Sequence, residues 1–88
     1  MKLVKTNLYK LHSIKLSKLR PCALRKLDEL EESISKSPKQ GIGCPEQLKG
    51  YRPQVVWSRR IIGKHRLIYE IRGDLIIFLS CYGHYKDH

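Results

Sequence analysis

A glutamate, an arginine and a histidine in this chain are of the types that together can cleave RNA without a metal. Attack by a ribose 2′-hydroxyl needs a base to accept its proton, an acid to protonate the leaving 5′-oxygen, and a fixed positive charge for the transition state. Glu46, His84 and Arg66 suit these tasks because a carboxylate accepts, an imidazolium donates, and a guanidinium binds phosphate through two hydrogen bonds without deprotonating. Further candidate phosphate contacts are Lys49, Arg59 and Arg60. Composition alone does not show that these residues converge.

The net charge of the chain points to the kind of partner. Eighteen Lys and Arg residues stand against eight Asp and Glu residues, which gives a formal charge of +10. An excess of this size in 88 residues indicates a polyanionic partner, either nucleic acid or an acidic protein, and a merely solubilising surface is the alternative. The charge is uneven, since every acidic residue comes after position 27.

The three cysteines bear on compartment and metal binding. Cys22, Cys44 and Cys81 are an odd number with no close pair, which favours a reducing cytoplasm over a disulfide framework. The spacing of Cys81, His84 and His88 is of a kind seen around zinc, but structural zinc needs four ligands and only the isolated Cys44 remains. We therefore expect no metal and no cofactor.

Length and hydropathy predict one small domain, residues 1–88, in the cytoplasm. The longest apolar run, Leu75–Leu79, is far shorter than the roughly 20 residues that span a bilayer. The basic N-terminus has no apolar stretch behind it, so we expect neither a signal peptide nor a membrane helix.

The pattern of apolar and turn residues predicts an α+β fold. A short strand and two helices precede a loop rich in glycine and proline, and an antiparallel meander follows. Apolar residues of the first helix do not fall on one stripe, whereas those of the second do. The expected elements are a strand at Lys2–Lys5, helices from Asn7 to about Leu19 and from Pro21 to Ser37-Pro38, a loop over Pro38–Pro53, and strands at Gln54–Ile62, His65–Arg72 and Leu75–Tyr82.

The alternation of the middle strand predicts which side chains share a face. His65, Leu67 and Tyr69 would face the core, and Arg66 the opposite side. A two-residue turn at positions 73–74 would place Arg66 across from Cys81, with the chain end just beyond it. An even-length hairpin loop would put Arg60 and Arg66 on opposite faces, whereas an odd loop or a bulge would unite them.

Three blocks of sequence resemble the YoeB toxins of the RelE superfamily. The first is similar to their GxGxPExLK loop, the second to their WSRRI and HRLVY strands, and the third to their CxxHY ending. The blocks are Gly41-Ile42-Gly43-Cys44-Pro45-Glu46-Gln47-Leu48-Lys49, then Trp57-Ser58-Arg59-Arg60-Ile61 with His65-Arg66-Leu67-Ile68-Tyr69, and Cys81-Tyr82-Gly83-His84-Tyr85.

The resemblance implies a toxin of a type II toxin–antitoxin system that cleaves translated mRNA on the ribosome. It implies that Glu46 is the general base, Arg66 the transition-state clamp and His84 the general acid, with Tyr85 positioning substrate. The implied partners are the ribosome with its mRNA and a YefM-like antitoxin with an acidic, initially flexible segment. A homodimer is left open.

The chain departs from the family pattern mainly between the loop and the next strand. Positions 48–57 are one residue longer than usual and include Pro53, while Cys44 and Gln47 stand where lysine and proline are common. Two other functions remain: a non-catalytic toxin of the same fold, which would not need the Glu, Arg and His set, and a basic nucleic-acid-binding module, which would bind RNA or DNA without cleaving it.

Overall fold

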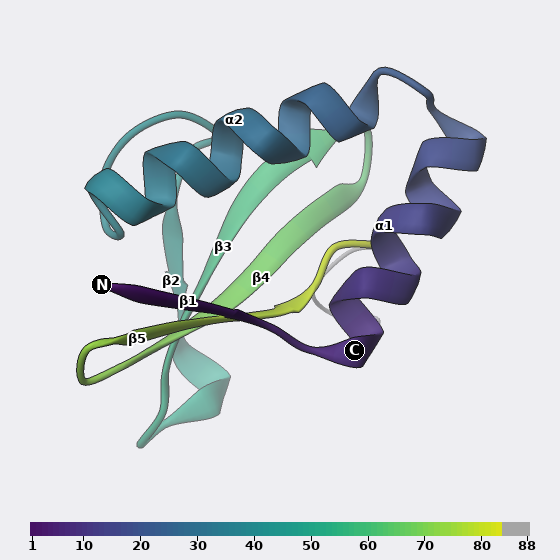
Figure 1. Cartoon of the computed structure of the whole chain (residues 1–88). Coiled ribbons are helices and arrows are strands. Elements are labelled where there is room, and N and C mark those ends of the chain that lie inside the picture. The colour runs from purple at the N-terminus through teal and green to yellow at the C-terminus, as the bar shows by residue number, and fades with distance from the viewer. Residues whose placement is uncertain (84–88) are drawn as a thin grey trace.

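The computed structural model describes residues 1–83 and shows an α+β fold in the predicted order of elements (Figure 1). The predicted class is confirmed, and the expected loop after the second helix contains one additional short strand. The elements are β1 (Lys2–Lys5), α1 (Asn7–Leu19), α2 (Ala23–Lys36), β2 (Glu46–Leu48), the 3-10 turn η1 (Lys49–Tyr51), β3 (Val55–Ile62), β4 (His65–Arg72) and β5 (Leu75–Ser80).

The helix ends follow from local chemistry. The Thr6 side chain accepts a hydrogen bond from the Tyr9 N–H at 3.0 Å and so caps the N-terminus of α1. The helix α2 begins at Ala23 rather than at the proline two positions earlier, because residues 21 and 22 form a turn. Its last residue is Lys36, and Ser37 is the C-cap just before Pro38, where the sequence predicted the helix to stop.

The five strands form one sheet in the order β1-β5-β4-β3-β2. Strands β3 to β5 pair antiparallel as predicted, and the additional strand β2 pairs antiparallel with β3. Strand β1 lies parallel to β5, with Lys2 beside Leu75, so the sheet is mixed. No turn motif could signal this pairing, because the two strands come from opposite ends of the chain.

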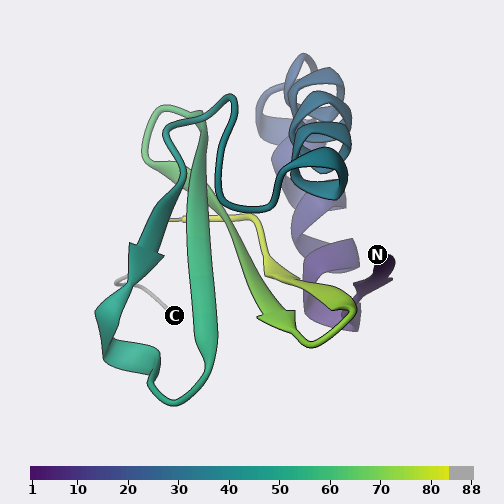
Figure 2. The same ribbon diagram turned by 90° about the vertical axis from the view of Figure 1, so that its left-hand side faces the viewer.

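Both helices cover the same face of the sheet, and within residues 1–83 the other face carries no α-helix (Figure 2). The main core lies between the helices and the sheet. A second, smaller cluster lies on the face away from the helices and joins Leu48, Val56 and Ile68, with Tyr51 and Leu79 at its edge. Prominent members of the main core are Tyr9, Leu16, Leu27, Leu30, Ile34, Leu67, Tyr69, Ile76 and Phe78.

Candidate functional site

Two arginines lie directly opposite each other on neighbouring strands. Arg60 of β3 pairs with Arg66 of β4, and a bulge between Arg60 and Ile62 sets this register. Of the two arrangements that the sequence left open, the bulge therefore selects the one that unites the arginines. Like charges opposite each other across two strands destabilise a sheet, so this pair is better explained by an anionic ligand than by folding.

Glu46 lies on the same face as the arginine pair. It pairs with Ser58 on β3, and Ser58 pairs with Ile68 on β4. This face is the one away from the helices, because Leu67 and Tyr69, which alternate with Arg66 and Ile68, belong to the helix-side core.

The strand geometry lets these side chains reach a common ligand. Two strand spacings of ~4.8 Å and two residues of ~3.4 Å place the Cα atoms of Glu46 and Arg66 roughly 12 Å apart. Glu46 and Arg60 are exposed and Arg66 is half-buried, so all three can contact a molecule from solution. Lys49 is also exposed and follows β2 directly, in η1.

Residues 1–83 use only part of the hydrogen-bonding capacity of the Arg66 guanidinium. Its Nη1 donates to the backbone oxygens of Gly63 at 3.0 Å and His65 at 3.2 Å. The alternative that Arg66 pairs with Glu70 is not observed, because Glu70 accepts from Arg72 at 3.0 and 3.2 Å. Within residues 1–83, Arg66 contacts no carboxylate.

Arg59 does not occupy the position that the sequence suggested for it. Its side chain is fully buried on the helix side, with 0% of its surface exposed. The guanidinium donates five hydrogen bonds, to the hydroxyls of Tyr69 and Ser33 and to the backbone oxygens of residues 37, 40 and 42. The expectation that Arg59 contacts phosphate is therefore wrong: strand alternation turns it away from Arg60 and into the loop after α2.

The end of β5 differs in register from the sequence expectation. Ile68 pairs with Ser80 while Tyr69 pairs with Phe78, so Leu79 is an extra residue. The bulge moves Cys81 out of register with Arg66, whose N–H instead donates to the Gly83 oxygen at 3.0 Å. The general acid and the substrate-positioning residue expected from the sequence, His84 and Tyr85, lie outside the described residues.

Several residues near the site were not singled out from the sequence. Ser58 belongs to the recognised tryptophan-serine-arginine-arginine block and lies between Glu46 and Ile68 on the site face. His12 accepts a hydrogen bond from the Cys81 N–H at 3.2 Å, across 69 residues of sequence. No local pattern marks His12, because its partner is set by the tertiary fold.

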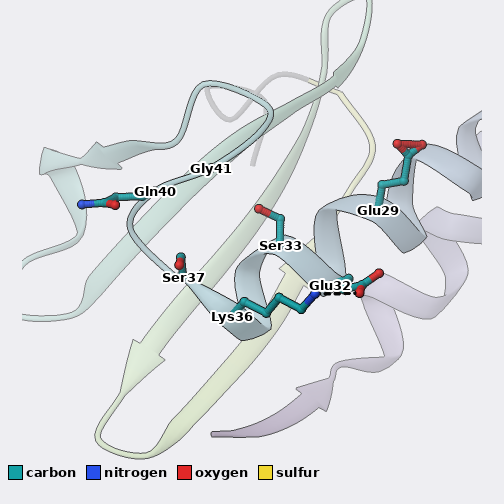
Figure 3. Close-up of a pocket in the computed structure, with 7 residues that line it drawn as sticks. All are labelled: Glu29, Glu32, Ser33, Lys36, Ser37, Gln40 and Gly41. Atoms are coloured by element: carbon teal, nitrogen blue, oxygen red, sulfur yellow. Dashed lines mark ion pairs between the residues drawn. The ribbon is translucent and has the colours of Figure 1, made fainter.

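A surface hollow of about 470 Å³ lies elsewhere, at the C-terminal end of α2 (Figure 3). Its lining includes Glu29 and the ion pair between Glu32 and Lys36, whose atoms lie 3.0 Å apart. The hollow belongs to the helix side and holds none of the predicted site residues. An acidic lining does not suit a phosphate chain, so we do not place RNA there.

The residues weighed for zinc are only partly described. His84 and His88 lie outside the described residues, and Cys81 is fully buried. Burial raises the pKa of the Cys81 thiol to about 12, so it stays protonated at neutral pH and is a poor metal ligand. In the described range, no three Cys, His, Asp or Glu side chains gather as a metal site, and no helix is long and apolar enough to cross a membrane.

Comparison with known proteins gives consistent matches. Residues 17–85 match the family described as YoeB-like toxin of bacterial type II toxin–antitoxin system. The chain is 40% identical over 67 residues to Toxin YoeB of Synechocystis sp., covering 72% of each chain. It is 37% identical over 62 residues to Toxin YoeB of Escherichia coli strain K12, covering 70% of this chain and 73% of the relative.

Solved structures match over nearly the whole chain. A YoeB/ParE toxin from Agrobacterium tumefaciens aligns with a TM-score of 0.85 and 31% identity, over 97% of this chain and all of that one. The YoeB dimer from Staphylococcus aureus aligns with a TM-score of 0.82 and 29% identity, over 97% and 98% of the two chains. The toxin in the Staphylococcus aureus YoeB–YefM toxin–antitoxin complex aligns with a TM-score of 0.78 over the same shares, also at 29% identity.

Proposed function

The chain belongs to the YoeB-like toxins of bacterial type II toxin–antitoxin systems, and on that premise we propose that it is a ribosome-dependent, metal-independent endoribonuclease. Its substrate would be mRNA under translation, which places its action in the cytoplasm. The observation that supports this most directly is the facing pair Arg60 and Arg66, with Glu46 one strand further along on the same face.

Each of these groups has a distinct task in the proposed reaction. The Glu46 carboxylate accepts the proton of the 2′-hydroxyl as that oxygen attacks the adjacent phosphorus. The guanidinium of Arg66 stabilises the negative charge that builds on the phosphate, and Arg60 and Lys49 hold neighbouring phosphates. The products would be a 2′,3′-cyclic phosphate and a free 5′-hydroxyl.

The remaining roles rest on sequence. His84 would protonate the leaving 5′-oxygen, and Tyr85 would position the substrate. Arg59 is left out of the substrate contacts, since a fully buried side chain cannot reach phosphate.

Primer extension on an mRNA translated by purified ribosomes tests the proposal. We expect cuts inside codons with the wild type and none with Glu46→Gln, which keeps the shape of the side chain but removes its basicity. Glu29→Gln is the matched control, because Glu29 is an exposed carboxylate on α2, far from the site face. Equal cutting by the Glu46 and Glu29 variants would disprove the role of Glu46.

The same assay separates the alternatives. Inhibition of translation with no cut at any codon would favour a non-catalytic toxin of this fold. Binding to RNA that weakens steeply with salt, with no cleavage, would favour a basic binding module. The product ends separate the proposal from a metal-dependent nuclease, because attack by a metal-activated water leaves a linear phosphate, whereas attack by the 2′-hydroxyl leaves a 2′,3′-cyclic phosphate.

A second part of the proposal concerns the antitoxin, which we place on the outer side of α1. Apolar residues occupy both sides of this helix: Tyr9 and Leu16 are buried in the core, while Leu8, Leu11 and Ile14 are at least half exposed. This explains why the sequence showed no single apolar stripe. The helix has no acidic residue, so the surface suits a partner segment with both apolar and acidic side chains.

The positive charge of α1 also bears on the identity of that partner. Lys10, Lys15 and Lys18 lie among the exposed apolar residues, so two copies facing each other through α1 would bring like charges together. An acidic YefM-like segment avoids this repulsion. Titration of a YefM-type antitoxin into Glu46→Gln protein should show tight binding that Leu11→Glu weakens at least tenfold and Asn7→Glu, a nearby exposed polar position, weakens much less.

A further inference from the structure

Two histidines hold the segment that leads from β5 to His84. The N–H of Cys81 donates to Nδ1 of His12 at 3.2 Å, and the N–H of Gly83 donates to Nδ1 of His65 at 2.9 Å. His12 comes from α1 and His65 from the first position of β4. The segment is thus tied to two elements that are distant from it in sequence.

Both hydrogen bonds depend on the protonation state of the imidazole. A ring nitrogen accepts only while its lone pair is free, so each Nδ1 must be unprotonated and the ring proton must be on Nε2. A protonated imidazole has donors at both nitrogens, and each would then face a backbone N–H. The Gly83 N–H is buried, so losing its acceptor would leave it without a partner.

The surroundings of His65 favour the neutral ring. Burial lowers its pKa, and the positive charges of Lys64, Arg20 and Arg66 lower it further. Arg20 follows α1 and lines a hollow of about 190 Å³ together with Lys64 and His65. From the segment itself, the Tyr82 ring contacts His65, with 4.6 Å between ring centroids.

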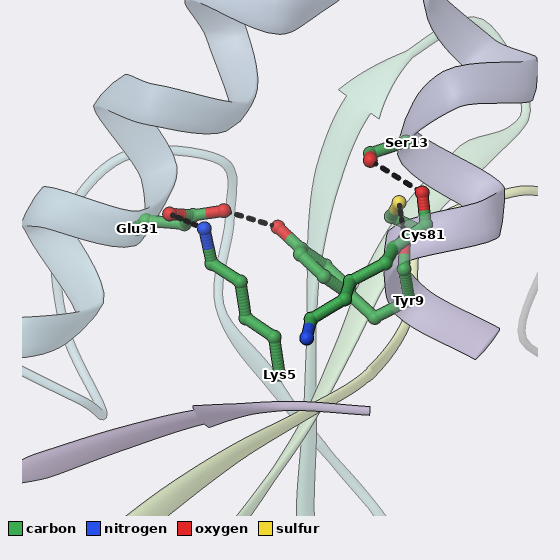
Figure 4. Close-up of polar contacts among 6 residues, drawn as sticks. Lys5, Tyr9, Ser13, Glu31 and Cys81 are labelled. Carbon is green, nitrogen blue, oxygen red and sulfur yellow. Dashed lines mark hydrogen bonds and ion pairs between the residues drawn. The ribbon is translucent and has the colours of Figure 1, made fainter. Parts of the chain in front are cut away.

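His12 faces the same segment from α1. Its ring centroid lies 6.0 Å from that of Tyr82, and the Lys15 ammonium lies 4.3 Å from the centre of that Tyr82 ring. Cys81 is held a second time, because its Sγ donates to the Tyr9 oxygen at 3.6 Å (Figure 4). Tyr9 in turn donates from its hydroxyl to Glu31 at 2.6 Å, and Glu31 pairs with Lys5 at 3.1 Å.

We propose that His12 and His65 are positioning residues for RNA cleavage. Their hydrogen bonds hold residues 81–83, the segment that leads to His84, and so fix the backbone from which the chain continues to this residue. They can do so only while both imidazoles are neutral. The idea rests on the proposed nuclease function. The Gly83 oxygen accepts a hydrogen bond from the Arg66 N–H, so the residue that precedes His84 in the sequence is tied to the backbone of the proposed transition-state clamp.

The proposal assigns opposite protonation states to histidines that serve one reaction. His84 must carry a proton to act as general acid, whereas His12 and His65 must not. Activity should therefore fall on the acid side as the positioning histidines become charged, and on the alkaline side as His84 loses its proton. A lowered pKa for His65 keeps it neutral at a pH where an ordinary histidine would already be partly charged.

The first test needs no nuclease activity. Protein with Glu46→Gln and 15N-labelled imidazoles is observed by long-range 1H–15N NMR at pH 7, with His12→Asn and His65→Asn used to assign the signals. We expect both rings to have an unprotonated Nδ1 and a protonated Nε2 at pH 7, and His65 to take up its second proton only at a lower pH than an ordinary histidine, because its pKa is lowered. A proton on Nδ1 of either ring at pH 7 would overturn the proposal.

The second test uses paired substitutions at each histidine. Asparagine puts an oxygen close to the position of Nδ1 and does not titrate, whereas leucine offers no acceptor. We expect His65→Asn and His12→Asn to cut mRNA within a few-fold of the wild type, with a weaker fall in activity at acid pH. The leucine variants should lose kcat by about 100-fold with a much smaller change in KM, because a misplaced catalytic group affects the chemical step.

The outcomes distinguish this idea from the proposed function. If the leucine variants fold and retain the wild-type kcat and acid limb, the positioning role is wrong although the nuclease stands. If the leucine variants do not fold, the asparagine variants and the NMR tautomers decide. If the wild type cuts nothing, the proposed function fails, and the tautomers still show whether the two acceptors hold the segment.

Discussion

Replacing Arg59 by methionine should destabilise the protein and loosen the loop before β2. The Arg59 guanidinium donates five hydrogen bonds, three of them to backbone oxygens of Ser37, Gln40 and Ile42. A second anchor runs in parallel, since the Tyr69 hydroxyl donates to the Pro38 oxygen at 2.6 Å. Methionine fills a similar space but donates nothing, so these acceptors lose their partner together.

The expected size of the effect follows from the partners of the guanidinium. Hydrogen bonds to a charged group are worth about 1.5–3 kcal/mol each, but part of that is offset because a charge is no longer buried and because water can reach loop oxygens. A net loss of roughly 2–4 kcal/mol is therefore expected. At about 0.05–0.15 kcal/mol per residue for the whole chain, this is a large share of the stability of so small a protein.

Urea unfolding followed by the fluorescence of Trp57, the one tryptophan of the chain, measures this loss directly. Arg60→Met is the matched control, because Arg60 is exposed and faces Arg66 across the strands. The control should unfold at the same urea concentration as the wild type or a higher one, and yet cut mRNA far more slowly. A change below ~1 kcal/mol for Arg59→Met, with unchanged hydrogen exchange over residues 37–43, would refute the reasoning.

Three further outcomes follow from single contacts. Tyr9→Phe removes the hydroxyl that donates to Glu31 and should lower the free energy of unfolding by about 1–2 kcal/mol, measured by the same urea titration. In a thiol titration with Ellman's reagent at pH 8, two cysteines should react in the native protein, and Cys81 only after unfolding. The pKa of the Cys81 thiol is raised to about 12 and its side chain is buried, so three fast-reacting thiols would contradict this prediction. Gly43→Ala should destabilise the loop and lower the melting temperature, because Gly43 has φ +83° and an added Cβ would approach the backbone oxygen of Arg60 to 3.0 Å. An unchanged melting temperature would show that the backbone can relax there.

The elements that the sequence predicted well are those with a local cause. The helix expected from Asn7 to about Leu19 has those bounds, and the strand at His65–Arg72 agrees as well, because a capping threonine and two glycine turns define their ends. The strand β2 was missed because its three residues lie on the edge of the sheet, inside a loop rich in glycine and proline, and are too few to show alternation.

Register was the part of the site that the sequence could not supply. Alternation alone predicted that Arg66 faces away from the core, and the structure agrees. Whether Arg60 joins it depended on a bulge, and the position of Cys81 depended on another at Leu79. A bulge changes which residues face each other without requiring any residue type, so no pattern in the chain announces it.

The neighbours Arg59 and Arg60 show why a run of basic residues does not by itself locate a site. Matching of sequence blocks treats the two alike, and both contribute equally to the charge of +10. In the fold, one is fully buried and bound to carbonyl and hydroxyl oxygens, while the other is exposed beside Arg66. The positive charge that a polyanion can contact is therefore smaller than the net charge of the chain suggests. The hairpin register, rather than the number of arginines, gathers this charge on one face of the sheet.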